Sequence, residues 1–255
     1  MLRVVVCYKW VADEADIKIN ADLTVDIGKA KGKISDYDRN AIEAAVQAAA
    51  DLGGQAVALT FGTAKAKQSL KDALSRGPEE AYYVNAEEAA RADGAVTAKA
   101  LATAIKRIEN VKLVVCAEGA SDTFARQTAP RIGAALDWPV ITSVSKIEIS
   151  GNTLTAIRKL EDCQQTVKIE LPAVVAVLPE ITDAPIPGLK SCLAAGKKPV
   201  TEIKAGELGI DFTPKAIVDG FQGYMMNRKN IIFSTGEAAD RVKELAAALR
   251  KEGVL

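Results

Sequence analysis

One segment of the chain combines polar side chains with the expected start of a helix. Residues 118–130 read EGASDTFARQTAP and follow an apolar run that ends at Cys116. Pro130 has no N–H and suits the first turn of a helix better than its interior, so we expect a helix to start near 126–128. The free N–H groups and positive dipole end of such a helix bind phosphate without a glycine-rich motif. The segment therefore predicts either a nucleotide site or a simple helix cap on a surface loop.

Other polar residues are expected at the same edge of the molecule. Within the segment, the candidate ligands are two hydroxyls, a cation and an amide: Ser121, Thr128, Arg126 and Gln127. Two strand ends, Cys7-Tyr8-Lys9-Trp10 and Thr60-Phe61-Gly62, and the helix start at 35–38 could line the same crevice, because parallel sheets bind ligands at the carboxyl ends of their strands. Gly62 would permit close backbone approach. The alternatives are a solvated charge for Lys9 and a capping box, Ser-x-x-Asp, for residues 35–38.

Composition excludes several function classes. The chain has no histidine, which rules out Ser-His-Asp triads, Cys-His dyads and His-ligated metal sites. Lys plus Arg and Asp plus Glu both number 33, so no basic surplus indicates binding to nucleic acid or an anionic membrane. Neither GxGxxG nor GxxxxGK[ST] occurs, so the usual dinucleotide fingerprint and the P-loop are absent. No constellation resembles a self-contained catalytic site, and a cofactor would have to supply any chemistry.

The first half of the chain alternates strand and helix signals. Apolar runs predict strands at 3–8, 55–60, 81–84, 112–116 and 140–142. Amphipathic stretches between them predict helices from 35 to 52, over 63–76 and 93–108, and up to 136. Two short alternating pieces, 17–20 and 24–27, indicate a small hairpin. Strands that alternate with helices imply an α/β fold with a mainly parallel, doubly wound sheet covered on both faces.

The pattern changes after Pro139. Strands expected at 146–149, 153–158 and 166–170 form an antiparallel flap, and the turn Ser150-Gly151-Asn152 joins the first two. The run 173–178 returns to the sheet. Prolines and glycines from 182 to 223 predict a loop, and 237–251 predicts an amphipathic helix on a long arm, which must dock on the body or on a partner. We expect a domain over 1–200 and a C-terminal arm over 201–255.

Cysteine usage and the length of the apolar runs bear on location. Cys7, Cys116, Cys163 and Cys192 are widely spaced and are expected to be free thiols. The longest apolar run, 173–178, is far shorter than the ~20 residues that a membrane span needs. The apolar stretch at the N-terminus is too short for a signal peptide. We therefore expect a cytoplasmic protein without a membrane span.

Four stretches carry a resemblance to a known family. They are VVVCYKWVADEADI at 4–17, KISDYDRNAIEAAV at 33–46, the segment 116–130, and RKLED at 158–162 followed by LPAVV at 171–175. Together they resemble the β subunit of electron transfer flavoproteins over essentially the whole chain. They look closest to the Fix-type branch, which shares CYK, the KIS motif and LSRGP at 74–78. The resemblance implies an α/β domain of the adenine-nucleotide-binding type.

That resemblance implies a heterodimer whose α subunit holds most of a redox-active FAD. The β subunit of the family holds either AMP or, in electron-bifurcating members, a second FAD. Contacts to this nucleotide are implied at the following positions: Cys7, Lys9, Asp36, Phe61, Gly62, Ser121, Asp122, Arg126, Gln127 and Thr128. Ser35-Asp36 replaces the family's usual Asn-Pro, and Ala129 replaces a frequent Gly, which leaves the choice between AMP and FAD open.

The resemblance also implies partners. Residues 182–199 look like the loop that docks acyl-CoA dehydrogenases, with Ile186-Pro187 at the anchor position and Leu189 beside it. The cationic residues Lys190, Lys197 and Lys198 would steer the approach. The C-terminal arm resembles the arm that wraps the α subunit. The expected protein is thus a β subunit that shuttles electrons between dehydrogenases and an acceptor, without catalytic residues of its own.

Two alternatives stay open beside this hypothesis. An electron-bifurcating version would oxidise NADH at a β-bound FAD and would make the chain part of an enzyme. A stand-alone nucleotide-dependent enzyme of similar fold, such as an ATP-pyrophosphate-splitting ligase, would show Ser-Gly-Gly-x-Asp-Ser after its first strand. This chain has Tyr8-Lys9-Trp10-Val11 there, which favours the carrier hypothesis.

Overall fold

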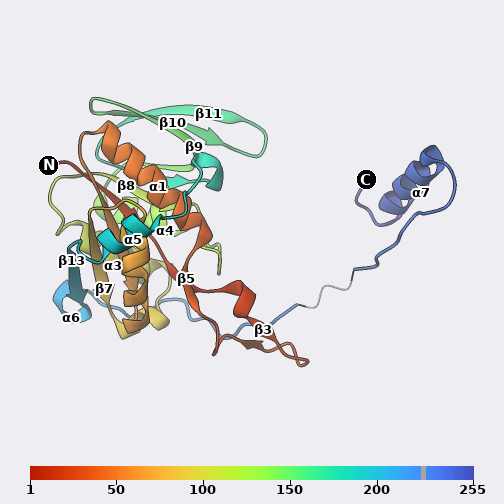
Figure 1. The fold of residues 1–255 in the computed structure, drawn as a ribbon, viewed down its shortest axis with the longest axis horizontal. Helices are drawn as coiled ribbons and strands as arrows, with labels where there is room; N and C mark the ends of the chain where they lie inside the picture. Colours follow the sequence, from red (N-terminus) through yellow and green to blue (C-terminus); the bar gives the residue numbers. More distant parts are fainter. Residues whose placement is uncertain (225–227) are drawn as a thin grey trace.

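The core of the protein is one nine-stranded sheet. The computed structural model describes residues 1–224 and 228–255. The parallel strands are β1 (Arg3–Cys7), β6 (Gln55–Gly62), β7 (Glu80–Asn85), β8 (Val111–Ala117), β12 (Ala173–Val177) and β13 (Val200–Lys204). The antiparallel flap consists of β9 (Val140–Ser150), β10 (Thr153–Lys159) and β11 (Gln164–Glu170). Figure 1 shows the sheet, whose strand order is β11-β10-β9-β12-β8-β1-β6-β7-β13.

Helices cover both faces of this sheet. One face packs against α1 (Asp36–Asp51), the 3-10 helix η2 (Ala64–Ser69), α2 (Leu70–Ser75) and α5 (Leu189–Ala195). The other face packs against α3 (Gly94–Ile105), α4 (Thr128–Leu136) and α6 (Ala205–Leu208). Because the central strands are buried on both faces, they carry the uninterrupted apolar runs that predicted them. The prediction of a doubly wound, mainly parallel α/β fold is confirmed.

The remaining elements are short and lie in the connections. Two small antiparallel pairs join β2 (Trp10–Ala12) to β5 (Gly32–Ile34) and β3 (Lys18–Ile19) to β4 (Val25–Asp26). Three further 3-10 helices are η1 (Glu14–Asp16), η3 (Glu87–Ala90) and η4 (Pro179–Ile181). The β3–β4 pair is the hairpin predicted from the alternating pieces. The helix predicted over 63–76 is present, but its first part is the 3-10 helix η2.

The order of the strands creates a switch point between β1 and β8. From β1 the chain moves outward to β6 and β7, and it then crosses to β8 on the other side of β1. Cys7 and Cys116 pair in register near the carboxyl ends of these two strands. In a doubly wound sheet, the loops that leave such a point diverge and open a crevice where ligands bind. The loops after β1 and β8 are therefore the first place to look for a site.

The flap rests on one long strand rather than on two. The segments predicted as separate strands at 140–142 and 146–149 form the single strand β9, which pairs in parallel with β12 and antiparallel with β10. Ser143 has a φ of 58°, and the register shifts beside it, so a bulge redirects the strand between its two partners. The prediction of two strands was wrong because a bulge changes the direction of a strand without ending it.

Residues 182–223 contain regular structure that the loop prediction missed. Helix α5, strand β13 and helix α6 lie within them. Strand β13 extends the sheet alongside β7, and it spans the boundary expected between residues 200 and 201. Pro187 and Pro199 stand just before α5 and β13, where proline flanks an element without interrupting it. Because β13 buries only Ile203, its sequence shows little of the usual strand pattern.

After α6 the chain becomes an arm whose first part is attached to the body. The ring of Phe212 stacks on Phe61 with centroids 6.2 Å apart. Asp93, which caps α3, also accepts hydrogen bonds from the backbone N–H groups of residues 215 and 216 at 2.8 and 3.1 Å. The N–H of Gly223 donates to the carbonyl oxygen of Leu23 in the β3–β4 hairpin at 2.7 Å. The arm is thus tethered at three places between residues 212 and 223.

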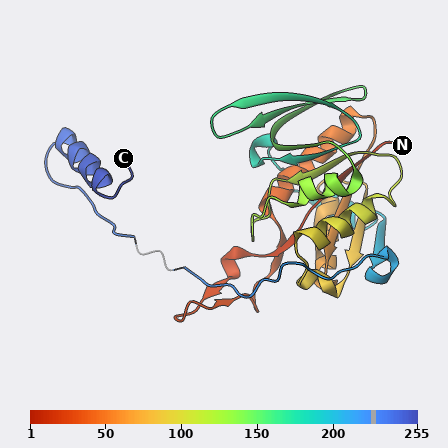
Figure 2. The same cartoon turned by 180° about the vertical axis from the view of Figure 1, so that it is seen from behind.

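The end of the arm carries the helix predicted from the sequence. Helix α7 (Ala238–Lys251) stands apart from the sheet in both views (Figures 1 and 2). Val242 and Leu245, on its apolar stripe, are 65% and 45% exposed. A helix of this length gains little stability from its own hydrogen bonds, so an apolar stripe normally packs against something. The residues of the body do not cover this stripe in the part of the chain that the structure describes.

Candidate functional site

The loops after β1 and β8 are joined by direct contacts at the switch point. The ammonium group of Lys9 lies 2.6 Å from a carboxylate oxygen of Asp122. The N–H of Ser121 donates to the hydroxyl oxygen of Ser35 at 3.1 Å, and the N–H of Ser35 donates to the carbonyl oxygen of Lys9 at 3.1 Å. Three segments that are distant in the sequence therefore meet at one point, where the sequence analysis expected a crevice. Lys9 is paired with Asp122 and is not a simple solvated charge.

The start of α1 takes part in these contacts in a way that differs from the predicted capping box. Ser35 stands at the N-cap position, but its side chain makes no cap hydrogen bond. Its hydroxyl oxygen accepts a hydrogen bond from the N–H of Ser121, and the carboxylate of Asp38 accepts one from the backbone N–H of Lys9 at 2.9 Å. The capping-box prediction was wrong because both side chains satisfy partners from other loops. Of the segment 35–38, Ser35 and Asp38 contact the loops after β8 and β1, whereas the carboxylate of Asp36 pairs with Lys33 and Arg39.

Asp38 is a buried acid at this point of the molecule. Its side chain has almost no exposure to solvent. Burial raises the pKa of Asp38 from its ordinary value of 3.8 to about 7, while the N–H and the positive charge of Lys9 limit the rise. The negative charge of Asp122 acts in the same direction as burial. A carboxyl group that changes its charge near neutral pH thus lies behind the Lys9–Asp122 pair.

The loop after β8 is held from inside by a second buried acid, Glu118. One carboxylate oxygen of Glu118 accepts hydrogen bonds from Nε and Nη2 of Arg126 at 3.1 and 2.8 Å. The other oxygen accepts the backbone N–H of Ser143, at the bulge of β9, at 2.8 Å. The guanidinium of Arg126 also lies over the ring of Phe124, 5.9 Å from its centroid. The sequence analysis gave Glu118 and Ser143 no role, and only the position of a charged residue directly after an apolar strand could have pointed to Glu118.

Helix α4 begins where the sequence analysis placed it, at Thr128. The N–H of Arg131 is bonded to the carbonyl oxygen of Gln127, and Pro130 has no N–H. Among the described residues, the N–H groups of Thr128 and Ala129 make no hydrogen bond within the protein, and no side chain caps the helix. These two donors and the dipole of the helix form a position for an anion at the edge of the crevice.

Three other residues named from the resemblance make their contacts with groups other than the start of α4. Cys7 is buried against Cys116, and the hydrogen bond between the two thiols, together with burial, raises the pKa of Cys116. The carboxylate of Asp36 pairs with Lys33 and Arg39 at 2.9 and 2.7 Å. Phe61 stacks on the arm, as described above.

Glycine at position 62 has a packing reason of its own. A Cβ atom on Gly62 would lie 2.6 Å from the Cβ of Ala66 in η2, closer than such atoms approach in proteins. The absence of a side chain therefore lets the end of β6 lie against η2. The backbone approach to a ligand that the sequence analysis expected at Gly62 stays a prediction.

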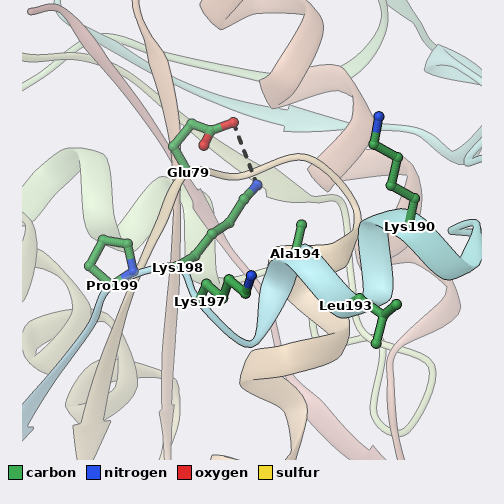
Figure 3. Close-up of a pocket in the computed structure, with 7 residues that line it drawn as sticks. All are labelled: Glu79, Lys190, Leu193, Ala194, Lys197, Lys198 and Pro199. Atoms are coloured by element: carbon green, nitrogen blue, oxygen red, sulfur yellow. Dashed lines mark hydrogen bonds and ion pairs between the residues drawn. The ribbon is translucent and has the colours of Figure 1, made fainter.

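A groove beside α5 lies at the other edge of the sheet. It has a volume of about 500 Å³ and lies next to the amino ends of β7 and β13, far along the strands from the crevice. Figure 3 shows its lining, with Lys198 directed at Glu79. Lys198 also donates to the carbonyl oxygen of Pro78 at 2.7 Å, so it holds the turn after α2 and is less available for steering than the sequence analysis expected. Lys190, Leu193 and Lys197 remain along the groove.

The apolar side chains of the expected docking segment are exposed. Ile186, Leu189 and Leu193 are 94%, 77% and 64% exposed, although each could have been buried in an ordinary packed loop. Large apolar side chains that lie close together on the surface of one chain often mark a site of interaction with another. The groove lies at the amino ends of β7 and β13, whereas the loops after β1 and β8 leave the carboxyl ends of their strands, so the groove and the crevice are separate features.

Comparison with known families decides the family. Residues 22–208 match the electron transfer flavoprotein domain. The chain belongs to the electron transfer flavoprotein family. The match runs from the β3–β4 hairpin to the end of α6. It includes the start of α1 and the loop after β8. Strand β1 and Lys9 lie before it, and the arm lies beyond it. Membership identifies the protein as a component of flavin-based electron transfer.

One structural finding bears on membranes. Among the described residues, none of the helices combines the length and the apolar character that crossing a bilayer requires.

Proposed function

We propose that this chain is the β-type subunit of a heterodimeric electron transfer flavoprotein, of the Fix-type branch that its motifs resemble. It shuttles electrons between a flavoenzyme of the acyl-CoA dehydrogenase type and an acceptor, through an FAD that the α subunit mainly binds. The observation that carries the proposal is the family match over residues 22–208, combined with an arm that lies beyond the matched domain and ends in a helix with exposed apolar side chains. FAD, when bound, supplies the electron-transfer chemistry, and the protein supplies binding and orientation.

In this proposal the crevice holds an adenine nucleotide, either AMP or a second FAD. The residues present fit a phosphate group, because the N–H groups of Thr128 and Ala129 offer two donors at the positive end of a helix. Lys9 lies on the facing loop, and its positive charge is balanced by Asp122. Arg126 is likewise paired with Glu118. The phosphate is therefore held mainly by backbone donors, and the charged side chains of the loops fix their shape.

The arm is the surface for the α subunit in this proposal. Large apolar side chains along it are exposed: Ile217, Val218, Phe221, Ile231, Ile232, Val242 and Leu245. Exposed apolar side chains of this kind often mark a site of interaction with another protein. The tethers at Phe212, Asp93 and Gly223 fix the point from which the arm departs, so a partner can be wrapped in a defined direction.

The docking surface for the dehydrogenase is the exposed row at the start of α5. Ile186 and Leu189 would enter a pocket of the partner as apolar anchors, and Lys190 and Lys197 would steer an acidic surface toward them.

The four cysteines are free thiols, which is in keeping with the cytoplasmic location that we propose.

The test is co-purification with the α subunit followed by cofactor analysis. The full chain is co-expressed with a tagged α subunit, and FAD and AMP are counted per complex. One FAD and one AMP per heterodimer supports a simple carrier, and two FAD supports a bifurcating complex. Leu245→Glu in α7 should abolish co-purification, whereas Glu244→Gln on the next position of the same helix should not. A chain that stays monomeric and free of flavin and nucleotide would contradict the proposal.

A further inference from the structure

Two residues with left-handed backbone conformation contact the buried carboxylate of Glu118, and the ring of a third lies beneath the guanidinium of one of them. Phe124, Arg126 and Ser143 have φ angles of 44°, 56° and 58°, and none of them is glycine. Such conformations are unfavourable for residues with a side chain and persist only where the surroundings hold them. The surroundings here converge on one group, because Glu118 bonds the side chain of Arg126 and the backbone N–H of Ser143.

The contacts of Glu118 join two parts of the molecule. Arg126 belongs to the loop that leads into α4, and Ser143 belongs to the bulge of β9, where the flap begins. The side chain of Glu118 is 5% exposed, so its bonds are shielded from competing water. Nη2 of Arg126 also lies 3.5 Å from the hydroxyl oxygen of Ser143, which brings all three residues together. A change at Glu118 would therefore release the loop and the bulge at once.

We propose that Glu118 is a positioning residue for the phosphate end of the nucleotide site. This inference rests on the proposed function. By holding Arg126 back in its left-handed conformation, Glu118 directs the chain so that the N–H groups of residues 128 and 129 point out of the loop. By bonding the N–H of Ser143, it fixes the loop against the flap. Glu118 does not touch the nucleotide, and it acts through the shape of the segment 119–127.

This role predicts which part of the nucleotide loses contacts when Glu118 is changed. The phosphate meets the start of α4, while the base and the ribose reach other parts of the crevice. Loss of the Glu118 contacts should therefore weaken binding of AMP and leave binding of adenosine, which lacks the phosphate, largely as it was. A side chain that only contributed to overall stability would weaken the binding of both ligands alike.

The experiment compares AMP and adenosine by titration calorimetry on the full chain. Glu118→Gln should lose about tenfold or more in AMP affinity. The substitution removes the negative charge that accepts two hydrogen bonds from Arg126, and it replaces one of the two carboxylate oxygens by an amino group. Its adenosine affinity should stay within about twofold of the wild type. Glu148→Gln is the matched control, because Glu148 lies on the same strand as Ser143, is exposed and pairs only with Lys146 among the described residues. It should change neither affinity.

Two further measurements separate positioning from general destabilisation. Arg126→Ala should lower AMP affinity, and the double variant with Glu118→Gln should lose no more than the larger single loss, because both changes release the same loop. Hydrogen exchange at the amide of Ser143 should become faster in Glu118→Gln and not in the control. Equal losses for AMP and adenosine, additive losses, or unchanged AMP binding would overturn the inference and leave the proposed function standing. A wild-type chain that binds neither AMP nor FAD would overturn both.

Discussion

The buried carboxyl group of Asp38 predicts a measurable dependence of stability on pH. Because its pKa rises from 3.8 to about 7 on folding, the folded protein keeps a proton between these pH values that the unfolded chain releases. Stability from this group is fully present below about pH 4 and is lost as the pH rises through 7. Each pH unit corresponds to about 1.4 kcal/mol, so the loss amounts to about 4 kcal/mol above pH 7.

Asp38→Asn removes this titration with little change in shape. The amide oxygen of asparagine can still accept the N–H of Lys9, which lies 2.9 Å from the carboxylate in the wild type. We expect the variant to be more stable than the wild type at pH 8 by up to about 4 kcal/mol, because the asparagine stays neutral where the buried carboxylate of the wild type is charged. Urea unfolding of both proteins from pH 5 to 9 gives the two free energies directly.

The control for this prediction lies on the same turn of α1. Asp36 has a half-exposed carboxylate that pairs with Lys33 and Arg39, so Asp36→Asn should retain the wild-type change of stability between pH 5 and 8. If Asp38→Asn shows the same slope of stability against pH as the wild type, Asp38 does not titrate near neutrality and the reasoning from its burial is wrong. A variant that is less stable at every pH would show that the asparagine side chain does not replace the protonated carboxyl group in this site.

Three further outcomes follow from hydrogen bonds away from the crevice. Lys198→Met removes the bond to the carbonyl of Pro78 and should lower the free energy of unfolding by ~1–3 kcal/mol in urea, whereas Lys197→Met should change it little. Tyr8→Phe breaks a buried bond to Ser69 and should cost about 1 kcal/mol by calorimetry, because the hydroxyl of Ser69 keeps a second partner. Asp93→Ala removes a helix cap and a tether of the arm, so it should cost ~1–2 kcal/mol and accelerate limited proteolysis over residues 209–224.

Each of these outcomes has a result that contradicts it. Equal stabilities for the two lysine variants would mean that Lys198 is solvated in solution. A loss of several kcal/mol in Tyr8→Phe would show that the surrounding core depends on the hydroxyl. Unchanged proteolysis of the arm in Asp93→Ala would show that Phe212 and Gly223 suffice to hold it.

The sequence predicted the central sheet well because burial on both faces leaves a direct mark on composition. The run from Val4 to Cys7 and the run from Ala173 to Val177 are apolar throughout, and each lies in a central strand. The start of α4 could be predicted for a similar local reason, since Pro130 limits where the helix begins. Signals of this kind depend only on residues within one element.

Features that depend on contacts between distant segments could not be predicted in the same way. Ser35 and Asp38 have the spacing of a capping box, yet Ser121 and Lys9 from other loops take up both side chains. Strand β13 exists because β7 offers an edge to pair with, and its own sequence buries only one residue. Tertiary contacts override local preference at such places.

The loop after β8, which we propose to hold a phosphate, shows how such a loop can lack the usual glycine-rich motif. Glycine is common in such loops because it adopts positive φ without strain. Here Phe124 and Arg126 adopt positive φ with their side chains in place. The guanidinium of Arg126 lies over the ring of Phe124 and also bonds Glu118. The strain of two left-handed residues is thus offset by contacts that glycine could not make. A search for glycines would pass over this loop, whereas a buried acid just after a central strand, followed within ten residues by an arginine and a helix start, describes it from its own residues.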